Sequence, residues 1–277
     1  MLRVTSLGSG SRGNAILVDG SEGSVLVDAG FGTRTLAKRL LAVARHPTDI
    51  GALVLTHEHT DHASGAREAC AKWQWPLYAS AGTLAALRGR AEAPSCSATA
   101  LPDTAPIVMH GFSVEHVGVP HDARDCRAVI LTDLRSGARV GIALDLGHVP
   151  AELPTAFARL DLIVVESNHD VAMLDAGPYP HLLKQRIRGG LGHLSNRVTS
   201  GLLSECAHRG LRGVLLAHLS ETNNTPELAI TGSQQALRRA GWSRDRVWAA
   251  PQRSVCGPMG LDGALGDVSA RQLSLGL

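Results

Sequence analysis

The chain has 277 residues, of which 44% are hydrophobic, and it carries a formal net charge of +2 at pH 7 with a pI near 8.4. This length fits one large domain or two small ones, and the hydrophobic fraction is ample for a large core. The small positive charge permits a polyanionic partner without requiring one. Aromatic residues make up only 3% of the chain, which argues against a base-stacking surface of the RNA-recognition type.

The predicted elements alternate along the chain, with apolar runs indicating strands and a 3.6-residue period indicating helices. In the first half, strands at 3–7, 14–18 and 24–28 precede a helix at 33–44, a strand at 52–56, a helix at 63–73, a strand at 76–79 and a helix at 81–89. In the second half, one or two strands at 107–119 and strands at 128–133, 139–145 and 162–166 precede helices at 184–187 and 196–209, a strand at 213–217 and a helix at 226–240. This order predicts an α/β fold in which two sheets lie between helices.

The domain organisation follows from the absence of internal repeats and long linkers. We expect one domain over residues 1–256, followed by a Gly-rich tail at 257–277 that is loosely attached. Ligands at the ends of strands are where such folds place their chemistry.

The cysteines and the first residues bear on the cellular compartment. The five cysteines are scattered, odd in number and without a CxxC pair: Cys70, Cys96, Cys126, Cys206 and Cys256. This usage is typical of a reducing compartment. The first residues lack the apolar segment of a signal peptide, and no apolar run approaches membrane-spanning length. We therefore expect a cytoplasmic protein without a membrane segment.

A cluster of metal-ligand residues directly follows the predicted strand at 52–56. Its sequence is HEHTDH, an HxHxDH pattern that contains His57, His59, Asp61 and His62. Alternate side chains of an extended segment point the same way, so His57 and His59 can bind one ion, and Asp61 and His62 point to a second ion as the chain turns. Imidazole and carboxylate ligands suit Zn, Mn or Fe. The alternative is a His-rich polar loop, but four ligand-type residues directly after a buried strand favour the metal site.

Three further residues each end an apolar run in the same manner: His121, Asp145 and His218. Each alone is most simply an ordinary loop residue, but together with the cluster they predict the remaining metal ligands. Asp28 ends another apolar run, where its carboxylate can orient the ligand loop from behind. The alternative for Asp28 is a turn residue, because Asp-Ala-Gly is common turn chemistry.

His193 is the additional catalytic candidate. It precedes a predicted helix, so the neighbouring Ser195 or Asn196 can simply cap that helix. A histidine near two metals can instead steady a phosphate oxygen or protonate a leaving group.

Two other features can contact an anionic substrate. The segment at 8–14, GSGSRGN, either approaches the substrate with backbone N–H groups or forms a simple hairpin turn. Basic residues that flank His193 can follow a phosphate backbone, although each alone reads as solvated surface charge: Lys184, Arg186, Arg188 and Arg197. No role is assigned to Asn168, His169, Asn223 or Asn224.

The ordered ligand set resembles that of the metallo-β-lactamase superfamily over most of the chain. A closer resemblance, to the bacterial YycJ/WalJ group of that superfamily, rests on specific stretches: SLGSGSRGN at 6–14, VPHDA at 119–123, ESNHD at 166–170, a YP followed by LLKQRIRGGLGHLSN up to 196, and LAHLSETNNTPELA at 216–229. The chain departs from many relatives at 127–129, where they carry Gly-Tyr and this chain carries Arg-Ala-Val. It is also too short for the insertion of the β-CASP nucleases.

The resemblance implies an α/β fold of the αββα four-layer metallo-β-lactamase type with a dinuclear metal site. His57, His59 and His121 would bind one ion and Asp61, His62 and His218 the other, with Asp145 between them. His193 would correspond to the additional histidine that phosphodiesterases of the tRNase Z and PhnP groups use on phosphate. The implied activity is that of a DNA exonuclease that works from 5′ ends with two divalent ions, Zn or Mn.

Charge supports a phosphodiester substrate. Two divalent ions outweigh the negative charge of Asp61, Asp145 and one hydroxide, and the small positive excess suits an anionic diester and its more highly charged transition state. In this scheme Asp61, His193 and Asp28 are the catalytic residues. The alternatives are a small-molecule, cyclic phosphodiesterase of the PhnP kind, a thioester or lactamase-type hydrolase, and a metal-binding protein without catalysis. A basic groove that leads to the metals would favour DNA, and an enclosed pocket would favour a small substrate.

Overall fold

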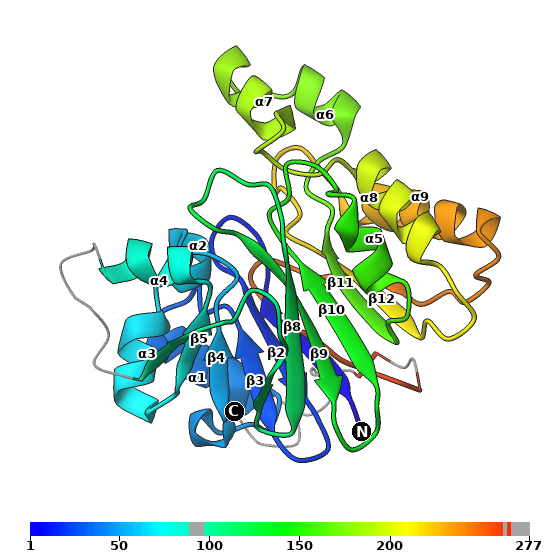
Figure 1. The fold of residues 1–277 in the computed structure, drawn as a ribbon. Helices are drawn as coiled ribbons and strands as arrows, with labels where there is room; N and C mark the ends of the chain where they lie inside the picture. Colours follow the sequence, from blue (N-terminus) through cyan, green and yellow to red (C-terminus); the bar gives the residue numbers. More distant parts are fainter. Residues whose placement is uncertain (89–96, 263–264, 267–277) are drawn as a thin grey trace.

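The computed structural model describes residues 1–88, 97–262 and 265–266. Two seven-stranded sheets face each other, and helices cover both outer faces (Figure 1). The αββα four-layer sandwich expected from the sequence is therefore confirmed. No helix in the described parts of the chain is both long and apolar enough to cross a lipid bilayer.

The first sheet runs in the order β14-β1-β2-β3-β4-β5-β6. Its strands are β1 (Arg3–Gly8), β2 (Ala15–Asp19), β3 (Ser24–Val27), β4 (Ala52–Val54), β5 (Leu77–Ala79), β6 (Ala98–Ala100) and β14 (Cys256–Gly260). Pairing is antiparallel from β14 to β3 and parallel from β3 to β6. Its helical elements are α1 (Thr33–Ala42), the short 3-10 helix η1 (Pro47–Asp49), α2 (Thr60–Ala63), α3 (Ala66–Trp73) and α4 (Ala81–Arg88).

The second sheet repeats this pattern, in the order β13-β12-β11-β10-β9-β8-β7. Its strands are β7 (Ile107–Met109), β8 (Phe112–Gly118), β9 (Arg127–Asp133), β10 (Arg139–Ala143), β11 (Leu162–Glu166), β12 (Gly213–Ala217) and β13 (Val247–Ala249). Pairing is antiparallel from β7 to β10 and parallel from β10 to β13. Its helices are α5 (Glu152–Phe157), α6 (Val171–Ala176), α7 (His181–Arg188), α8 (Asn196–Cys206) and α9 (Pro226–Arg239).

Every residue of the central strands β3 and β11 is buried, because both faces of each sheet are covered. Successive side chains of a strand point to opposite faces. In β3, Val25 and Val27 therefore enter the core between the sheets, whereas Leu26 packs in the core beneath α1 and α3. A third core joins the outer face of the second sheet to α5, α8 and α9. This packing fixes the strand ends, where the ligand-type residues lie.

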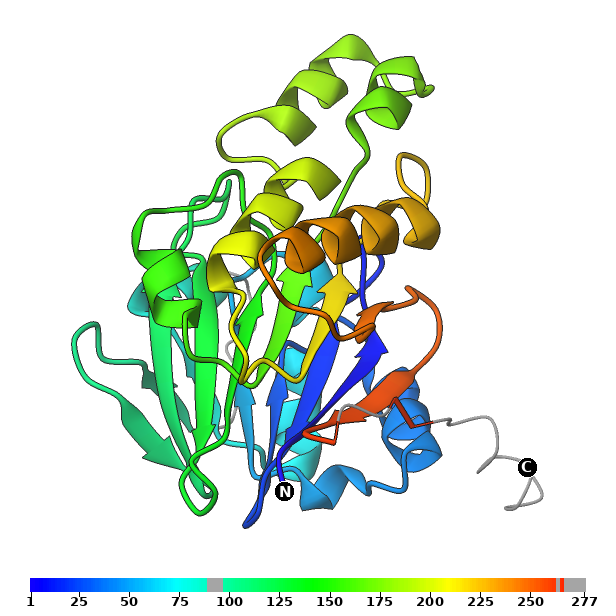
Figure 2. The ribbon, with the colours of Figure 1, turned by 90° about the vertical axis from the view of Figure 1, so that its right-hand side faces the viewer.

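Helices α6 and α7 differ from the others in position. Both stand beyond one end of the sandwich, away from the two sheets (Figures 1 and 2). We call residues 171–188, which contain both helices, the α6–α7 arm.

Strand β14 changes the expected division of the chain. It pairs with β1 through Arg3↔Gly260 and Val4↔Met259, so residues 257–260 belong to the first sheet rather than to a loose tail. The predicted boundary at 256 is therefore too early. Residues 263–264 and 267–277 lie outside the described residues.

One predicted helix is divided. The segment at 63–73 contains the end of α2 and the whole of α3, which are separated at Ser64 and Gly65. Gly65 N donates to Ala29 O, and a Cβ on Gly65 would lie 1.9 Å from the carbonyl oxygen of Phe31. This close approach requires glycine and interrupts the helix where the chain packs against the loop after β3.

Candidate metal centre

The site lies where β3, β4, β10 and β12 end, and the residues that follow these strands meet there. Asp28 follows β3, Asp145 follows β10 and His218 follows β12. All three have positive φ, at 64°, 57° and 52° respectively. This conformation is uncommon outside glycine and is often found at functional sites. The three side chains therefore leave their strands by the same sharp turn.

The HxHxDH segment follows β4 and bends as the sequence indicated. His57 is fully buried, and His59 is the N-cap of the short helix α2, which carries Asp61 and His62. The extended part thus contributes His57 and His59, and the first turn of the helix contributes the other two. The expected change of direction between the two pairs is present.

Two sets of ligand-type atoms gather around Asp145, each within 4.8 Å of one another. The first set contains His57, His59, His121 and Asp145, and the second contains Asp61, His62, Asp145 and His218. This division is the one that the family resemblance implied. The structure brings all seven predicted ligand residues together, and their assignment as metal ligands remains our proposal.

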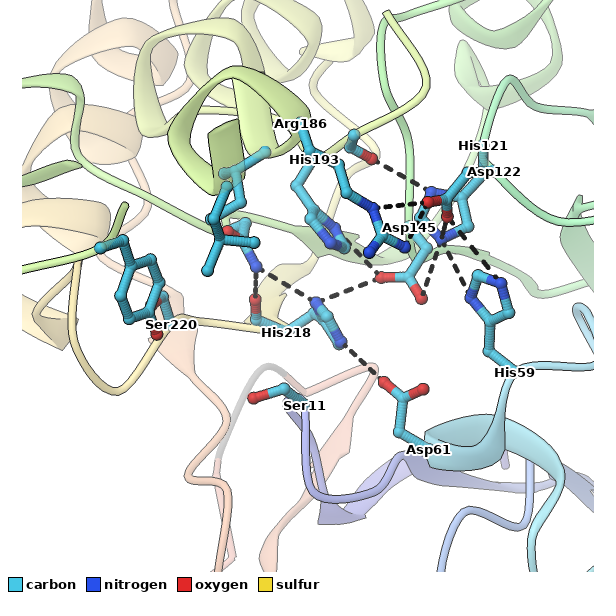
Figure 3. Close-up of a pocket in the computed structure, with 15 residues that line it drawn as sticks. Ser11, His59, Asp61, His121, Asp122, Asp145, Arg186, His193, His218 and Ser220 are labelled. Atoms are coloured by element: carbon cyan, nitrogen blue, oxygen red, sulfur yellow. Dashed lines mark hydrogen bonds and ion pairs between the residues drawn. The ribbon is translucent and has the colours of Figure 1, made fainter. Parts of the chain in front are cut away.

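Asp145 contacts members of both sets. Its Oδ2 lies 2.7 Å from His62 Nε2 and 3.3 Å from His57 Nε2, and its Oδ1 lies 3.1 Å from His218 Nδ1. Between the other members, His121 Nε2 lies 3.3 Å from His59 Nδ1. Figure 3 shows five of the seven residues converging on one cavity: His59, Asp61, His121, Asp145 and His218.

The donor atoms fit divalent ions. His57 Nε2 and Asp145 Oδ1 are buried and make no well-aligned hydrogen bond among the described residues, although His218 Nδ1 lies within ion-pair distance of Asp145 Oδ1. Burial, together with the neighbouring His62, holds the pKa of His57 well below its ordinary value, so this imidazole is neutral and able to bind a cation. A buried acceptor nitrogen and a buried carboxylate oxygen without hydrogen bonds are costly unless an ion or water satisfies them. Imidazole and carboxylate groups in this number suit Zn or Mn.

Asp28 contacts the ligand segment from behind, at the position from which we expect it to orient that segment. Its Oδ2 accepts a hydrogen bond of 2.7 Å from His62 Nδ1, and its Oδ1 accepts one of 2.8 Å from the backbone N–H of Thr56. Asp28 and His62 are both fully buried. The bond at Nδ1 leaves His62 Nε2 to face Asp145 and the centre of the site, as in carboxylate–histidine–metal arrangements.

Glu166 supports His193 in a similar way, and the sequence analysis did not identify it. Glu166 Oε1 accepts a hydrogen bond of 2.6 Å from His193 Nδ1, and Oε2 accepts from the backbone N–H groups of Leu146 and Leu194. Glu166 ends the apolar strand β11, so it carried the same signal as Asp28 and Asp145.

The charges of this pair reinforce each other. Burial raises the pKa of Glu166, but His193 outweighs burial and holds that pKa at about 2. Burial lowers the pKa of His193, but Glu166 and Asp145 outweigh it and raise that pKa well above its ordinary value. His193 also belongs to a third set of ligand-type atoms, with Asp145, Glu166 and His218. The carboxylates of Glu166 and Asp145 therefore favour the protonated form of His193.

The loop between β1 and β2 is hydrogen-bonded to the segments that carry Asp61 and His218. Asn14 is fully buried, and its Nδ2 donates to the carbonyl oxygen of Asp61. Ser9 Oγ donates to Asn14 Oδ1 at 2.8 Å and accepts from the backbone N–H of His218 at 2.9 Å. Gly30 allows this packing, since a Cβ there would lie 1.7 Å from Asp61 O. The segment at 8–14 thus positions ligand-type residues as well as reaching the cavity.

The unassigned polar residues hold the loops after β11 and β12. Asn168 Nδ2 donates to His218 O at 3.0 Å, and Asn224 Nδ2 donates to the carbonyl oxygens of Ser167 and Asn168. His169 forms an isolated bridge with Ser195. These contacts stabilise the turn that presents His218. At 127–129, where the chain departs from many relatives, the backbone N–H of Arg127 donates to Thr56 O beside the ligand segment, a contact that does not depend on the side chain.

The centre opens into a cavity of about 280 Å³. Its lining comes from segments spread between residues 11 and 220: Ser11, His59, Asp61, His121, Asp122, Asp145, Asn168, Tyr179, Leu183, Arg186, Ile187, Gly192, His193, His218 and Ser220. Asp122 lies inside it, with Oδ1 3.2 Å from His121 Nε2 and Oδ2 accepting from Arg186 Nε at 2.9 Å. Figure 3 shows Arg186 on the side of the cavity opposite Ser11 and Asp61.

The four basic residues singled out in the sequence do not form one continuous track. Arg186 alone among them lines the cavity. Lys184 Nζ donates to Asp175 O at 2.8 Å, and Arg188 pairs with the Asp175 carboxylate. Arg197 is exposed on α8. Cations on solvent-exposed side chains exchange such partners at little cost.

Comparison with known proteins agrees with this geometry. A model of the metallo-beta-lactamase superfamily matches residues 8–132. Exodeoxyribonuclease WalJ of Streptococcus pneumoniae is 31% identical over 228 residues, covering 80% of this chain and 83% of that protein. Exodeoxyribonuclease YycJ of Bacillus anthracis is 29% identical over 242 residues, covering 87% of this chain and 91% of that protein.

Solved structures support the fold. The metallo-beta-lactamase fold protein YhfI of Bacillus subtilis superposes with a TM-score of 0.68 at 17% identity, over 92% of this chain and 99% of that one. The short form of human tRNase Z gives a TM-score of 0.61 at 16% identity, over 91% of this chain and 98% of that one. These identities establish the likeness of fold alone, whereas the WalJ match establishes the family. The chain belongs to the metallo-β-lactamase superfamily, as a metal-dependent hydrolase that resembles WalJ and YycJ.

Proposed function

We propose that the protein is a dinuclear-metal phosphodiester hydrolase that removes nucleotides from DNA ends, acting from the 5′ end. The observation that carries the proposal is the position of Asp145, whose carboxylate belongs to all three sets of ligand-type atoms, including the two that would hold one ion each. Two neighbouring cations suit an in-line displacement at phosphorus, because they can stabilise both the attacking and the leaving oxygen. Relatives named exodeoxyribonuclease, similar over most of their length, support DNA as the substrate.

Each ion would have its own set of residues. His57, His59 and His121 would hold one, Asp61, His62 and His218 the other, and Asp145 both. Zn or Mn in these positions would supply Lewis acidity and a hydroxide at neutral pH. Asp28 would keep His62 in the tautomer that binds a cation.

The chain's own acid is His193. Its Nδ1–H is taken by Glu166, so the other ring nitrogen of this cavity-lining residue is the one available to substrate. A protonated imidazole there can donate to a non-bridging phosphate oxygen or give its proton to the leaving oxygen.

Arg186 provides a second cationic contact. Its guanidinium reaches into the cavity and is held by Asp122. A guanidinium binds a phosphate through two parallel hydrogen bonds, so a substrate phosphate can take the place of the Asp122 carboxylate. His193 and Arg186 together favour an anionic diester over a neutral ester or lactam.

The proposal is tested with protein loaded with Mn or with Zn. Duplex DNA labelled at a 5′ end, the same duplex labelled at a 3′ end, and bis-(p-nitrophenyl) phosphate are compared as substrates. We expect stepwise release of the 5′ label, which is lost in His59→Ala and retained in His46→Ala, a change at an exposed histidine outside the site. Release of the 3′ label first would contradict the direction. Turnover of the small diester alone would replace the proposal by a small-molecule phosphodiesterase, and inactivity on both would overturn phosphodiester hydrolysis.

A further inference from the structure

The α6–α7 arm carries apolar side chains that the fold does not use. Helix α7 has no buried residue, although its sequence is HLLKQRIR. Leu182 is 78% exposed, and Leu183 is 37% exposed. In Figures 1 and 2 the helix stands apart from both sheets and their cores. Large apolar side chains that pack into no core are a common mark of a binding surface.

The two sides of α7 face different surroundings. Leu183, Arg186 and Ile187 are spaced three and four residues apart, so they share one face of the helix, and all three line the metal-site cavity. The opposite face carries His181, Lys184, Gln185 and Arg188, which lie around Asp175 in a separate depression. Leu182 lines neither of these cavities, nor the one beside His169 and His193.

Tyr179 extends the apolar part of the inner face. It precedes α7 by two residues and lines the metal-site cavity with Leu183 and Ile187. No hydrogen bond to its hydroxyl is present among the described residues, so the ring is not held in place through that group. We call Tyr179, Leu183 and Ile187 the α7 wall.

The cavity is therefore divided by chemistry. The ligand-type residues and His193 on one side, with Arg186 reaching in from α7, account for a phosphate group. The α7 wall does not bind a phosphate, because apolar and aromatic surfaces do not bind anions. The substrate must thus carry, next to its phosphate, a group with apolar faces.

We propose that the α7 wall seats the base of the terminal nucleotide, the one that hydrolysis releases. The inference rests on the proposed function and adds to it a subsite for the substrate's base. A base has a flat face that stacks on an aromatic ring and a polar edge that tolerates the wet, polar lining around it. The cavity of about 280 Å³ has room for a single nucleotide rather than a stack of bases. Arg186, on the same helical face, holds the phosphate while the wall holds the base.

An acyl chain is a poorer occupant. It would need an apolar surface on all sides, whereas charged and polar residues form most of this lining, Asp122, Asn168 and Ser220 among them. One tyrosine with two aliphatic neighbours is also sufficient for one base, which agrees with a chain of low aromatic content.

The experiment compares two duplexes of the same sequence, one of which has a tetrahydrofuran abasic unit as its 5′-terminal nucleotide. We expect the metal-loaded wild-type protein to release the intact terminal nucleotide about tenfold faster, as kcat/KM, than the abasic one, a typical contribution of one stacked base. Tyr179→Ala and Leu183→Ala should lower the rate on intact DNA about as much and leave the abasic substrate unchanged. Tyr179→Phe should match the wild type.

Leu182→Ala is the matched control, because it removes the neighbouring leucine on the same helix but outside the cavity. It should leave both rates unchanged, and no variant should alter the Tm, since α7 buries none of its residues and Tyr179 is only partly buried. Equal rates on the two duplexes with wild-type protein would overturn the base seat while leaving the exonuclease proposal intact. Equal losses on both duplexes in Tyr179→Ala would also overturn it. No release from either duplex would instead refute the proposed function itself.

Discussion

The sandwich and the α6–α7 arm contribute to one cavity in opposite ways. In the sandwich, every residue of β3, β11 and β12 is buried, and the ligand-type residues follow directly from these and neighbouring strands. In the arm, α7 buries none of its residues, yet three of its side chains line the same cavity. The difference teaches that the candidate metal centre is held in place by the buried strands, whereas the α7 side of the cavity is formed by a helix that packs into no core. Changes in the sandwich should therefore affect metal binding, and changes in the arm should affect substrate alone.

Asp145→Asn is the strongest test of metal binding by the residues that follow the strands of the sandwich. The amide keeps the size of the side chain, and asparagine tolerates the positive φ at this position. It removes the negative charge that both sets of ligand-type atoms share. We expect a loss of at least about 100-fold in kcat/KM, beyond the range of residues that only support a ligand, and loss of bound metal measured by elemental analysis after dialysis.

Asp133→Asn is the control for Asp145→Asn. Asp133 is also buried but lies at the end of β9 remote from the site, where it accepts hydrogen bonds from Ser21 and Ser136. We expect it to change the Tm and not the metal content. Full metal content in Asp145→Asn would contradict the proposed ligand assignment.

Asp28→Asn tests whether the fold positions the ligands from behind. Asparagine keeps a similar shape but cannot accept from both His62 and the backbone N–H of Thr56 with full strength. We expect about 10- to 100-fold weaker metal binding, the usual effect of such supporting residues. Titration with Mn, followed by hydrolysis of a DNA end, measures it. If saturating metal does not restore most of the rate, Asp28 does more than orient His62.

The sandwich was largely predictable from the sequence, for a physical reason. Strands buried on both faces are continuous apolar runs, and polar residues that end such runs are easily recognised. The pattern therefore located Asp28, the HxHxDH segment, His121, Asp145 and His218, all of which the structure brings together. The short edge strands β6 and β13 were not predicted; both are only partly buried, unlike the equally short β4.

The arm was harder to predict. Helix α7 was expected at 184–187 only, since it has no apolar stripe that repeats through its length, and α6 was not expected at all. The inner face of α7 can be recognised only when the position of the helix beside the cavity is known. That position depends on tertiary packing. The division of α7 into an inner and an outer face, which separates Arg186 from Arg188, is likewise invisible in a count of basic residues.

Glu166→Gln probes the junction between the two regions, where His193 receives its charge. Glu166 raises the pKa of His193, so removal of that negative charge should lower it. His193 then loses its proton at a lower pH, and the alkaline limb of the kcat profile should move toward lower pH. We also expect kcat to fall about 10-fold or more, consistent with the usual contribution of a general acid. A profile that keeps its alkaline limb would show that His193 does not act as the acid.

The smallest effect should come from the arm, with Arg186→Ala compared against Arg188→Ala. The two arginines lie on the same exposed helix and each pairs with one aspartate, Asp122 or Asp175. Exposed pairs contribute about 0–1 kcal/mol, so neither change should alter the Tm. Only Arg186 lines the cavity. We therefore expect it alone to raise the KM for DNA, by about three- to tenfold, and to make the slope of log KM against log salt shallower by about one for the lost phosphate contact. An equal increase for Arg188→Ala would mean that DNA lies along the outer face of α7 rather than against the cavity, and the contrast between the two faces would then fail.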